Sequence, residues 1–387
     1  MNPSGPDLAG TRPRSPLLGA AGLLPRQSIR ELANRRVVQA VTEIRPSQYQ
    51  PASLDLRLGR KAYRVRASFL PGSAATVADR LAALHPEPIA LGEGAVLERG
   101  CVYVVELLES LDLPDTISAF ANPKSSTGRL DVFTRLITDR SEVFDSVESG
   151  YRGPLYAEVS PRSFSVKVRT GTRLNQIRFR RRTSNQEETV ERRLSDRDIG
   201  ELHRRVRLVD GALNLRNGLA MRIELGGMGP GNLVGYRAQR HADIIDVDRS
   251  AQYRVADFWE PIRAHPDRRL ILDPNEFYIL ASKERLQIPP DHAAEMVPID
   301  PSMGEFRVHY AGFFDPGFGA TEAGEPGSRA VLEVRSHEVP FSLEDGQTVC
   351  RLAYERMVEP PDGLYGTIGT SNYQGQELKL SKQFTGD

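Results

Sequence analysis

The sequence contains few of the residues on which several large classes of protein depend. Its 387 residues include two cysteines, one tryptophan and seven histidines. Cys101 and Cys350 are too few for a disulfide framework or a cysteine-based zinc site, and we expect a protein of the reducing cytoplasm. The histidines are scattered without the spacing of metal ligands. The composition therefore gives no reason to expect a metal ion held by the protein itself.

A net charge of either sign and long apolar runs are also missing. Lysine plus arginine and aspartate plus glutamate each number 51, so the formal net charge is zero. A general nucleic-acid binder is usually basic overall, so we expect no nucleic-acid partner. No apolar run approaches the roughly 18 residues of a membrane-spanning helix, so we expect no membrane partner. The apolar stretch at residues 16–25 is short and broken by glycine, which predicts a flexible N-terminal tail over residues 1–24 rather than a signal peptide.

The chain contains a tandem duplication. Residues 102–114 resemble residues 277–289 at an offset of 175 positions. The same offset places Glu158 on Glu333, and the Thr-Gly pair at 170–171 on the Asp-Gly pair at 345–346. Chance does not readily hold one offset over such a span, so the repeat predicts two domains of the same fold. Residues 54–59 resemble residues 221–226 at a different offset, which predicts an insertion between these points.

Both halves have the pattern of β-proteins. Residues 163–168 and 329–334 alternate with a period of two, and glycine and proline turns separate such segments. Helical patterns are few, at residues 26–38, 74–84 and 196–205. We expect a mainly β fold of two duplicated, distorted jelly-roll barrels over residues 25–183 and 207–387. The segment over residues 184–206 mixes arginines with acidic residues, which predicts a solvated linker and helix between the halves.

The most informative segment is Lys-Ser-Ser-Thr-Gly-Arg at residues 124–129, just after a strand-like run. Lys124 and Arg129 bring positive charge, and Ser125 and Ser126 bring hydroxyl donors, within one short turn. Such a cluster can hold an anionic ligand together with backbone N–H groups. A polar turn without a ligand can have the same composition, so this segment alone leaves both interpretations open.

Several segments together resemble the two-domain form of the dCTP deaminases, relatives of the trimeric dUTPases. The Lys-Ser-Ser-x-x-Arg pattern at 124–129 is similar to the family's phosphate- and water-positioning segment. Residues 50–59 and 173–179 resemble two strands of the family, and residues 309–319 resemble its nucleoside-binding hairpin. Tyr365 and the Tyr-Gln-Gly-Gln run at 373–376 resemble the lid that closes on the triphosphate. The resemblance implies a dUTPase-like barrel in each half and a homo-oligomer.

The resemblance also implies an activity: the hydrolysis of dCTP to dUTP and ammonia, which feeds dTTP synthesis. It implies dTTP as an inhibitor and Mg²⁺ bound only with the triphosphate. The zinc deaminases combine an H-x-E pattern with P-C-x-x-C, and the P-C-x-x-C signature is absent from the sequence, so we expect no zinc. Two rival functions stay open. One is a dUTP diphosphatase or a bifunctional enzyme, because residues 150–153 resemble a dUTPase hairpin, although Asp145 lies too far upstream of Tyr151 for the usual spacing. The other is a non-catalytic nucleotide-binding relative.

The motifs are divided between the halves. The Ser-Ser-x-x-Arg segment occurs only in the first half, and at residues 300–304 its counterparts are Asp300, Pro301 and Gly304. The hairpin and the lid occur only in the second half. In the family, different subunits contribute these parts, so the resemblance predicts one composite site per pair of halves, within one chain or between two. Its expected members are Arg129 and Ser125 for catalysis with Lys124 and Ser126 for substrate, and from the second half Glu333 for catalysis with Ala311, Gly312, Phe313, Asp315, Tyr365, Tyr373, Gln374 and Gln376 for substrate.

One glutamate is expected to move the protons of the reaction. A carboxylate can do so when partial burial brings its pKa near neutrality, and Glu333 lies in an apolar strand beside the intact hairpin. Glu158 is the alternative, because it shares a half with Arg129; the glutamate that is not catalytic is expected to be a solvent-facing strand residue. The chain departs from the family pattern at Asn372 and Phe318, and in a glycine-rich insertion at residues 320–328.

Overall fold

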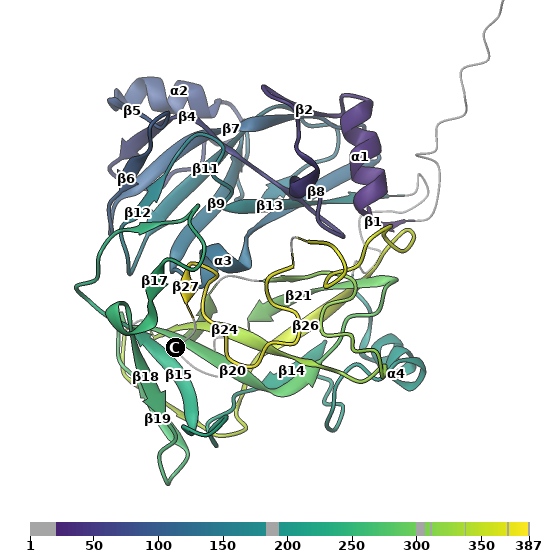
Figure 1. Ribbon diagram of the computed structural model, residues 1–387. Helices are drawn as coiled ribbons and strands as arrows, with labels where there is room; N and C mark the ends of the chain where they lie inside the picture. Colours follow the sequence, from purple (N-terminus) through teal and green to yellow (C-terminus); the bar gives the residue numbers. More distant parts are fainter. Residues whose placement is uncertain are drawn as a thin grey trace, which may run out of the picture.

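The computed structural model describes residues 21–182, 193–298, 306–309, 312–336, 338–369 and 371–385, with only the backbone at 306–309. Strands dominate these residues, and the longer helices lie at the edges of the molecule (Figure 1), so the predicted mainly β class is confirmed. Most of the predicted tail, linker residues 183–192, the counterpart segment at 300–304 and Ala311 lie outside the described residues. Among the described residues, no helix is long and apolar enough to cross a membrane.

The described residues of the first half form two large sheets, a third small sheet shared with β16 of the second half, and three α-helices. The 3-10 turn η1 is Pro46–Gln48. The helices are α1 (Arg26–Asn34), α2 (Val77–Leu84) and α3 (Ser125–Gly128). The strands are β1 (Gly22–Leu23), β2 (Val38–Ala40), β3 (Leu54–Asp55), β4 (Leu58–Val65), β5 (Pro88–Ala90), β6 (Ala95–Leu97), β7 (Val102–Asp112), β8 (Ile117–Pro123), β9 (Val132–Thr138), β10 (Ser146–Val147), β11 (Arg152–Pro161), β12 (Val166–Val168) and β13 (Asn175–Arg181).

The second half begins with helix α4 (Asp196–Arg205) and includes the 3-10 turn η2 (Val255–Asp257). Its strands are β14 (Leu219–Arg222), β15 (Leu233–Ala238), β16 (Ile245–Asp246), β17 (Tyr253–Arg254), β18 (Trp259–Arg263), β19 (Arg269–Leu272), β20 (Phe277–Leu286), β21 (His292–Pro298), β22 (Phe306–His309), β23 (Phe313–Phe314), β24 (Ser328–Ser336), β25 (Phe341–Glu344), β26 (Thr348–Arg356) and β27 (Phe384–Thr385).

The predicted helices exist, and the differences lie at their ends. Helix α4 has the predicted bounds, and Ser195 caps its N-terminus by accepting from the Asp198 N–H. Helix α1 stops early because Arg36 has a φ of +60° and the chain then enters β2. Helix α2 starts at Val77, directly after its cap Thr76. The strand predicted at residues 163–168 is shorter, since only Val166–Val168 pair with neighbours.

The duplication is visible in the strand order. One sheet runs β3-β13-β8-β10 in the first half and β14-β26-β21-β23 in the second. The other runs β4-β7-β11-β9 and β15-β20-β24-β22. Ala157 pairs with Val105 and Leu332 pairs with Leu280, so the register itself repeats at an offset of 175. The prediction of two copies of one fold is confirmed.

The predicted alignment at the start of each half is wrong by two residues. Leu54 pairs with Ile177, and Leu219 pairs with Leu352, which is the equivalent of Ile177. Residues 54–59 therefore correspond to residues 219–224 rather than to 221–226. A shift of two leaves an alternating strand pattern unchanged, so the sequence pattern could not distinguish the two alignments.

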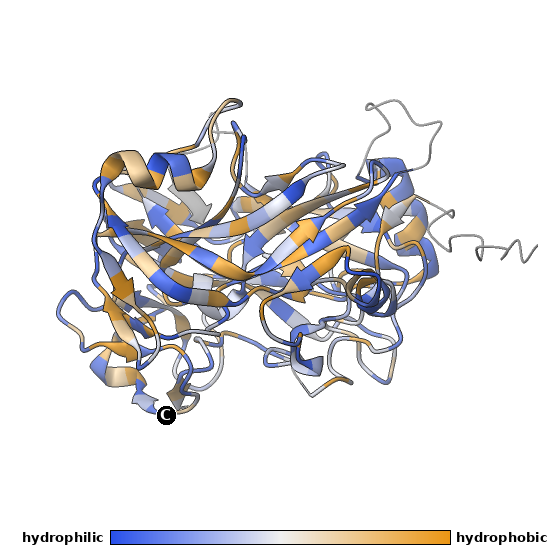
Figure 2. Cartoon of the chain, turned by 90° about the horizontal axis from the view of Figure 1, so that it is seen from above, coloured by the Kyte–Doolittle hydropathy of each residue, from blue (hydrophilic) through white to orange (hydrophobic). Residues whose placement is uncertain are grey.

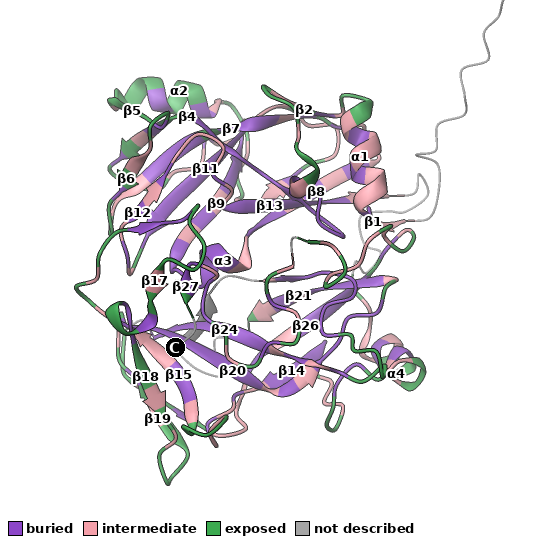
Figure 3. Cartoon of the chain, viewed as in Figure 1, coloured by how far each residue is buried: buried purple, intermediate pink, exposed green. Residues whose placement is uncertain are grey.

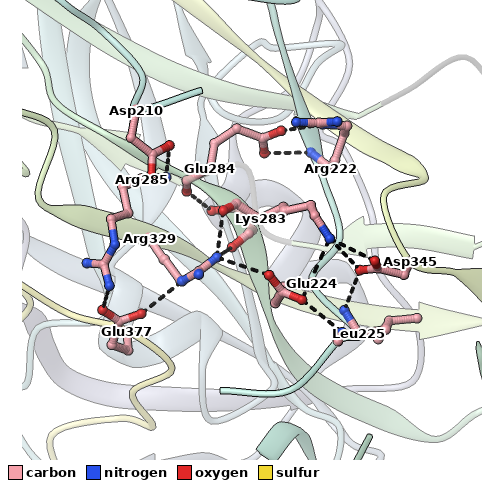
Figure 4. A network of polar contacts seen from close by, with 12 residues as sticks. Asp210, Arg222, Glu224, Leu225, Lys283, Glu284, Arg285, Arg329, Asp345 and Glu377 are labelled. Carbon is pink, nitrogen blue, oxygen red and sulfur yellow. Dashed lines mark hydrogen bonds and ion pairs between the residues drawn. The ribbon is translucent and has the colours of Figure 1, made fainter. Parts of the chain in front are cut away.

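A repeated ion pair supports the corrected alignment. Arg57 Nε lies 2.7 Å from Glu109 Oε1, and Arg222 Nε lies 2.6 Å from Glu284 Oε1. In both pairs the second carboxylate oxygen accepts from the backbone N–H of the same arginine. Figure 4 shows the second pair beside a larger ionic network of the second half. The duplication has therefore preserved a polar anchor as well as the sheets.

The apolar cores lie along the long strands. Figure 2 shows hydrophobic residues spread along the strands of both halves, and Figure 3 shows these strands as mostly buried. The core of the first half extends into the second: Phe164 packs edge to face on Trp259 at 5.4 Å, and Trp259 packs on Phe384 of β27 at 5.9 Å. The C-terminal strand is thus fastened into a core that both halves share.

Candidate active site

Helix α3 carries the Lys-Ser-Ser-x-x-Arg segment to the junction between the halves (Figure 1). The Thr127 N–H donates to the Lys124 carbonyl over 2.8 Å, and the Arg129 N–H donates to the Ser125 carbonyl over 3.1 Å. This single turn follows β8 directly, so the strand fixes its position. As a result, the first half presents lysine, serine and arginine side chains to the second half.

A cavity of about 50 Å³ lies where the halves meet, and both halves line it. The first half contributes Lys124, Ser125 and Arg129, and the second contributes Gly312, Phe313, Asp315, Phe318, Glu333, Tyr365, Tyr373 and Gln376. One chain therefore brings together the segments that were expected to form a composite site.

Glu333 lies on β24 and faces Arg129 across this cavity. Its side chain is nearly fully buried, and its Oε1 lies 4.0 Å from Arg129 Nε. Burial raises the pKa of Glu333 to about 8, although the positive charge of Arg129 acts in the opposite direction. Arg129 Nε is itself buried and has no hydrogen-bond partner among the described residues. The site thus combines a carboxyl group whose pKa lies near neutral pH with an N–H donor, Arg129 Nε, that has no hydrogen-bond partner among the described residues.

The C-terminal lid holds Arg129 in place. Arg129 Nη2 donates to Gln376 Oε1 over 3.0 Å, and Nη1 donates to the Lys379 carbonyl over 2.7 Å. The guanidinium lies over the Tyr373 ring, and the Tyr373 hydroxyl lies 2.6 Å from the Ser126 hydroxyl. The lid therefore contacts both a charged side chain, Arg129, and a hydroxyl group, that of Ser126, of the first half.

The second half fixes the lid in turn. Gln374 donates to the Gly317 carbonyl over 3.2 Å and accepts from the Gly319 N–H over 3.0 Å, so this residue binds the hairpin and does not line the cavity. Glu377 accepts from Arg329 Nε over 2.8 Å and also pairs with Arg285 (Figure 4). These contacts bracket Gln376, which orients Arg129.

The hairpin is anchored to the first half by a residue that the sequence did not single out. Arg178 of β13 donates to Asp315 Oδ1 over 2.8 Å, and its guanidinium lies 4.0 Å from the centroid of the Phe313 ring. Burial raises the pKa of Asp315, while Arg178 opposes this effect. Gly319 is required here, because an added Cβ would lie 2.0 Å from the Leu286 carbonyl oxygen. The sequence signal that could have identified Arg178 was its position between two apolar residues of a core strand.

Phe318, which departs from the family pattern, packs as an aromatic wall of the cavity. It lies edge to face with Phe314 at 5.1 Å and contacts Tyr365 at 5.5 Å. Tyr365 accepts from the Tyr373 N–H over 3.0 Å, so the hairpin and the lid meet at these rings.

Glu158 lies at the position equivalent to Glu333 but away from the cavity. Its Oε1 accepts from Arg135 Nη2 over 2.6 Å, and Arg135 stacks on Phe144. The prediction that one of the two glutamates faces solvent is wrong, because Glu158 is 1% exposed and Glu333 is 5% exposed. An arginine under an aromatic ring makes burial of Glu158 possible.

A second, larger cavity of about 280 Å³ adjoins the first, and Lys124 and Ser126 contribute to it. Lys124 Nζ lies 2.5 Å from Asp55 Oδ1, and Arg173 also contacts this aspartate. Burial and the nearby lysine and arginine lower the pKa of Lys382, which lines the same cavity. Asp55 and Arg173 belong to segments quoted for their resemblance to the family, but no role was predicted for them.

The described residues contain no group of three or more histidine, cysteine, aspartate or glutamate side chains arranged to hold a metal ion. The carboxylates of the larger cavity are already engaged: Asp55 pairs with two cations, and Asp248 accepts from the Thr172 hydroxyl over 2.6 Å.

Comparison with known proteins identifies the family. The model of the 2'-deoxycytidine 5'-triphosphate deaminase N-terminal domain matches residues 20–183, and the model of the C-terminal domain of the same family matches residues 195–384. This chain belongs to the dCTP deaminase family. The crystal structure of 2'-deoxycytidine 5'-triphosphate deaminase from Agrobacterium tumefaciens is similar, with 53% sequence identity and a TM-score of 0.83. The match covers 88% of this chain and 99% of the Agrobacterium chain.

More distant relatives match between a third and two fifths of this chain. The dUMP-forming dCTP deaminase of Methanobrevibacter smithii is 31% identical over 34% of this chain and 66% of its own length. The dCTP deaminase of Natronomonas pharaonis is 26% identical over 38% of this chain and 73% of its own length. Both belong to the dCTP deaminase family, and their printed names differ in the product.

Proposed function

We propose that this chain is a dCTP deaminase that hydrolyses dCTP to dUTP and ammonia. The observation that carries the proposal is the buried Glu333, with a pKa raised to about 8, facing Arg129 in a cavity built by both halves. Membership of the dCTP deaminase family supports dCTP as the substrate.

In this proposal Glu333 carries the protons of the reaction. Its carboxylate accepts a proton from a water molecule whose oxygen bonds to cytosine C4, and the resulting acid protonates N3. Glu333, again a carboxylate, then takes the proton of the new C4 hydroxyl and passes it to the amino group. The C4–N bond breaks, ammonia leaves, and a C4 carbonyl remains. Ser125 and the free Nε–H of Arg129 orient the water, because both line the cavity with Glu333. A side chain with a pKa near the working pH is suited to this exchange.

The hairpin and the lid hold the nucleotide. Gly312, Phe313 and Phe318 form the apolar side of the cavity against the base and sugar, while Tyr365, Tyr373 and Gln376 close it. The triphosphate extends toward the larger cavity, where Lys124, Arg173 and Lys382 supply positive charge. Mg²⁺ enters as part of the magnesium–dCTP substrate, held by phosphate oxygens, since Asp55 and Asp248 already have partners. Inhibition by dTTP, homo-oligomerisation and a cytoplasmic location stay predictions.

A dUMP-forming enzyme is the second candidate, because the Methanobrevibacter relative carries that name. The residues predicted for a separate diphosphatase do not line either cavity. Asp145 Oδ1 accepts from the Leu136 N–H over 2.7 Å, and the Tyr151 hydroxyl donates to the Pro154 carbonyl over 2.6 Å. A second reaction would therefore use the same composite site.

Product analysis tests both candidates. Purified protein is incubated with dCTP and with dUTP, each with Mg²⁺, and ammonia, diphosphate, dUTP and dUMP are quantified. Ammonia with dUTP supports the proposal; ammonia with dUMP and diphosphate supports the second candidate. Tight binding of dCTP without any product would indicate a non-catalytic nucleotide-binding protein. Removal of Mg²⁺ should weaken dCTP binding, and zinc retained after dialysis and needed for turnover would contradict the proposed role of the metal.

A further inference from the structure

A buried ion pair between Asp131 and Arg335 joins the two halves beside Glu333. Asp131 Oδ2 accepts from Arg335 Nη2, and the Ser163 hydroxyl donates to the same oxygen over 2.6 Å. Asp131 is 1% exposed and Arg335 is 6% exposed. Neither residue lines the cavity, and neither belongs to the site predicted from the sequence.

This pair repeats the contact of Arg129 with Glu333 two residues further along each half. Arg129 and Asp131 flank one residue in the turn after α3, and Glu333 and Arg335 flank one residue on β24. Side chains two residues apart on a strand lie on the same face, so Glu333 and Arg335 share a face of β24. Two arginine–carboxylate contacts therefore cross the junction side by side. The first half supplies the arginine in one of them and the carboxylate in the other.

The backbone at Asp131 ties this pair to the position of Arg129. Asp131 has a φ of +55°, a left-handed conformation that aspartate and asparagine adopt more readily than most residues. Its N–H donates to the Gly128 carbonyl over 2.8 Å, and its carbonyl accepts from the Arg162 N–H over 2.9 Å. The turn that presents Arg129 thus ends at the residue that Arg335 holds.

Energetics favour a positioning role over a purely stabilising one. Desolvation of two charges offsets much of their attraction, and buried ion pairs are best documented as devices that fix register. We propose that the Asp131–Arg335 pair is a positioning element of the active site, which sets α3 against β24 so that Arg129 reaches Glu333 and which neutralises Asp131 beside that glutamate. This inference rests on the proposed deaminase function.

The charges around Glu333 make this proposal measurable. The described groups that face it are Arg129 and Asp131 from the first half, Cys350 from β26 and Tyr373 from the lid, and His309 is its register partner on β22. Burial is the largest cause of the raised pKa of Glu333; Arg129 lowers this pKa and Asp131 raises it. Removing one member of the Asp131–Arg335 pair should therefore move the pKa in a direction that depends on which charge is left.

The test compares Asp131→Asn, Arg335→Met and the double variant by ammonia release from dCTP. Each single variant should lower kcat between about 10-fold and 100-fold, with less effect on KM, because a displacement of about 1 Å at a catalytic contact has consequences of this size. The rising limb of kcat/KM against pH should move to lower pH in Asp131→Asn and to higher pH in Arg335→Met. The double variant contains no unpaired charge, so its limb should return toward that of the wild type while kcat stays lowered.

Arg180→Met is the matched control, because the half-buried Arg180 forms another ion pair between the halves, with the buried Glu355 at 2.6 Å, outside the cavity lining. It should lower stability and leave the pH profile in place. Shifts in the same direction for both single variants, or a double variant with wild-type kcat, would overturn the inference. If a single variant does not fold, the double variant still decides through its kcat. A wild-type protein that releases no ammonia would instead overturn the proposed function.

Discussion

The guanidinium of Arg129 lies 3.8 Å from the centroid of the Tyr373 ring, so an aromatic residue of the lid covers the arginine that faces Glu333. The same tyrosine reaches the Ser126 hydroxyl. Tyr373 therefore links the position of the lid to the position of Arg129, because this single side chain contacts both a charge and a hydroxyl of the first half.

Substitution of Tyr373 should separate these two contacts. Tyr373→Phe keeps the ring over Arg129 and loses the hydroxyl contact, which is worth about 0.5–1.5 kcal/mol, so KM for dCTP should rise by about 10-fold at most. Tyr373→Leu also removes the cation–π contact, worth about 0.5–2 kcal/mol, and should lower kcat as well. Steady-state kinetics of both variants would test this order, and equal kinetics would contradict it.

Glu333→Gln and Glu158→Gln should differ sharply. Glutamine keeps the shape of the side chain but cannot accept the proton, so Glu333→Gln should lose about 100-fold to 10,000-fold in kcat while still binding dCTP. Glu158→Gln should remain active, because this residue lies with Arg135 outside the cavity. Ammonia release and equilibrium binding would be measured on both proteins. An inactive Glu158→Gln with an active Glu333→Gln would place the reaction in the first half.

Activity should rise with pH as Glu333 loses its proton. Because burial raises its pKa to about 8, the carboxylate form that accepts a proton from water becomes dominant only above that pH. The logarithm of kcat/KM should therefore increase up to about pH 8 and then level off. Since Arg129 lowers this pKa, the limb should move to higher pH in Arg129→Met, where residual activity permits measurement. A profile that is flat from pH 6 to pH 9 (about three units) would contradict the assignment.

Burial of the same carboxyl should also affect stability. Below the ordinary pKa of 4.5, Glu333 is protonated in both the folded and the unfolded protein. Between this value and about 8, the unfolded chain releases the proton and the folded chain keeps it, so the free energy of unfolding falls as pH rises. The fall should be a few kcal/mol at most, since about 1.4 kcal/mol corresponds to one pKa unit. Denaturant titrations should show it in the wild type and less of it in Glu333→Gln.

The two copies of the repeated ion pair should not contribute equally. The Arg57 side chain is 6% exposed, whereas the Arg222 side chain is 37% exposed. Glu109→Gln leaves a deeply buried arginine without its charge partner and should cost about 3–5 kcal/mol. Glu284→Gln should cost less, because water can solvate Arg222. Urea unfolding of the two variants gives the comparison, and equal losses would argue against burial as the cause.

The sequence predicted what local pattern and repetition encode. The offset of 175 was readable because paired strands keep their register, and the resemblance of residues 124–129 and 309–319 was readable because each motif is contiguous. The sequence did not reveal that Arg178 pairs with Asp315 or that Asp131 pairs with Arg335, because the members of these pairs lie 137 and 204 positions apart. Each member of these pairs is a single residue within an ordinary strand or turn. Only the packing of one half on the other shows that such a residue has a partner.

The union of both halves in one chain also has a genetic consequence. In a ring of identical subunits, each codon change alters every copy of a surface, whether that copy serves the site or not. Here the segment that became Arg129–Asp131 and its counterpart in the second half are encoded separately. Each half can therefore accumulate changes that suit one role alone. In addition, both halves of the site described here are encoded by the same allele, so a defective allele does not contribute one half of a site whose other half comes from a functional allele.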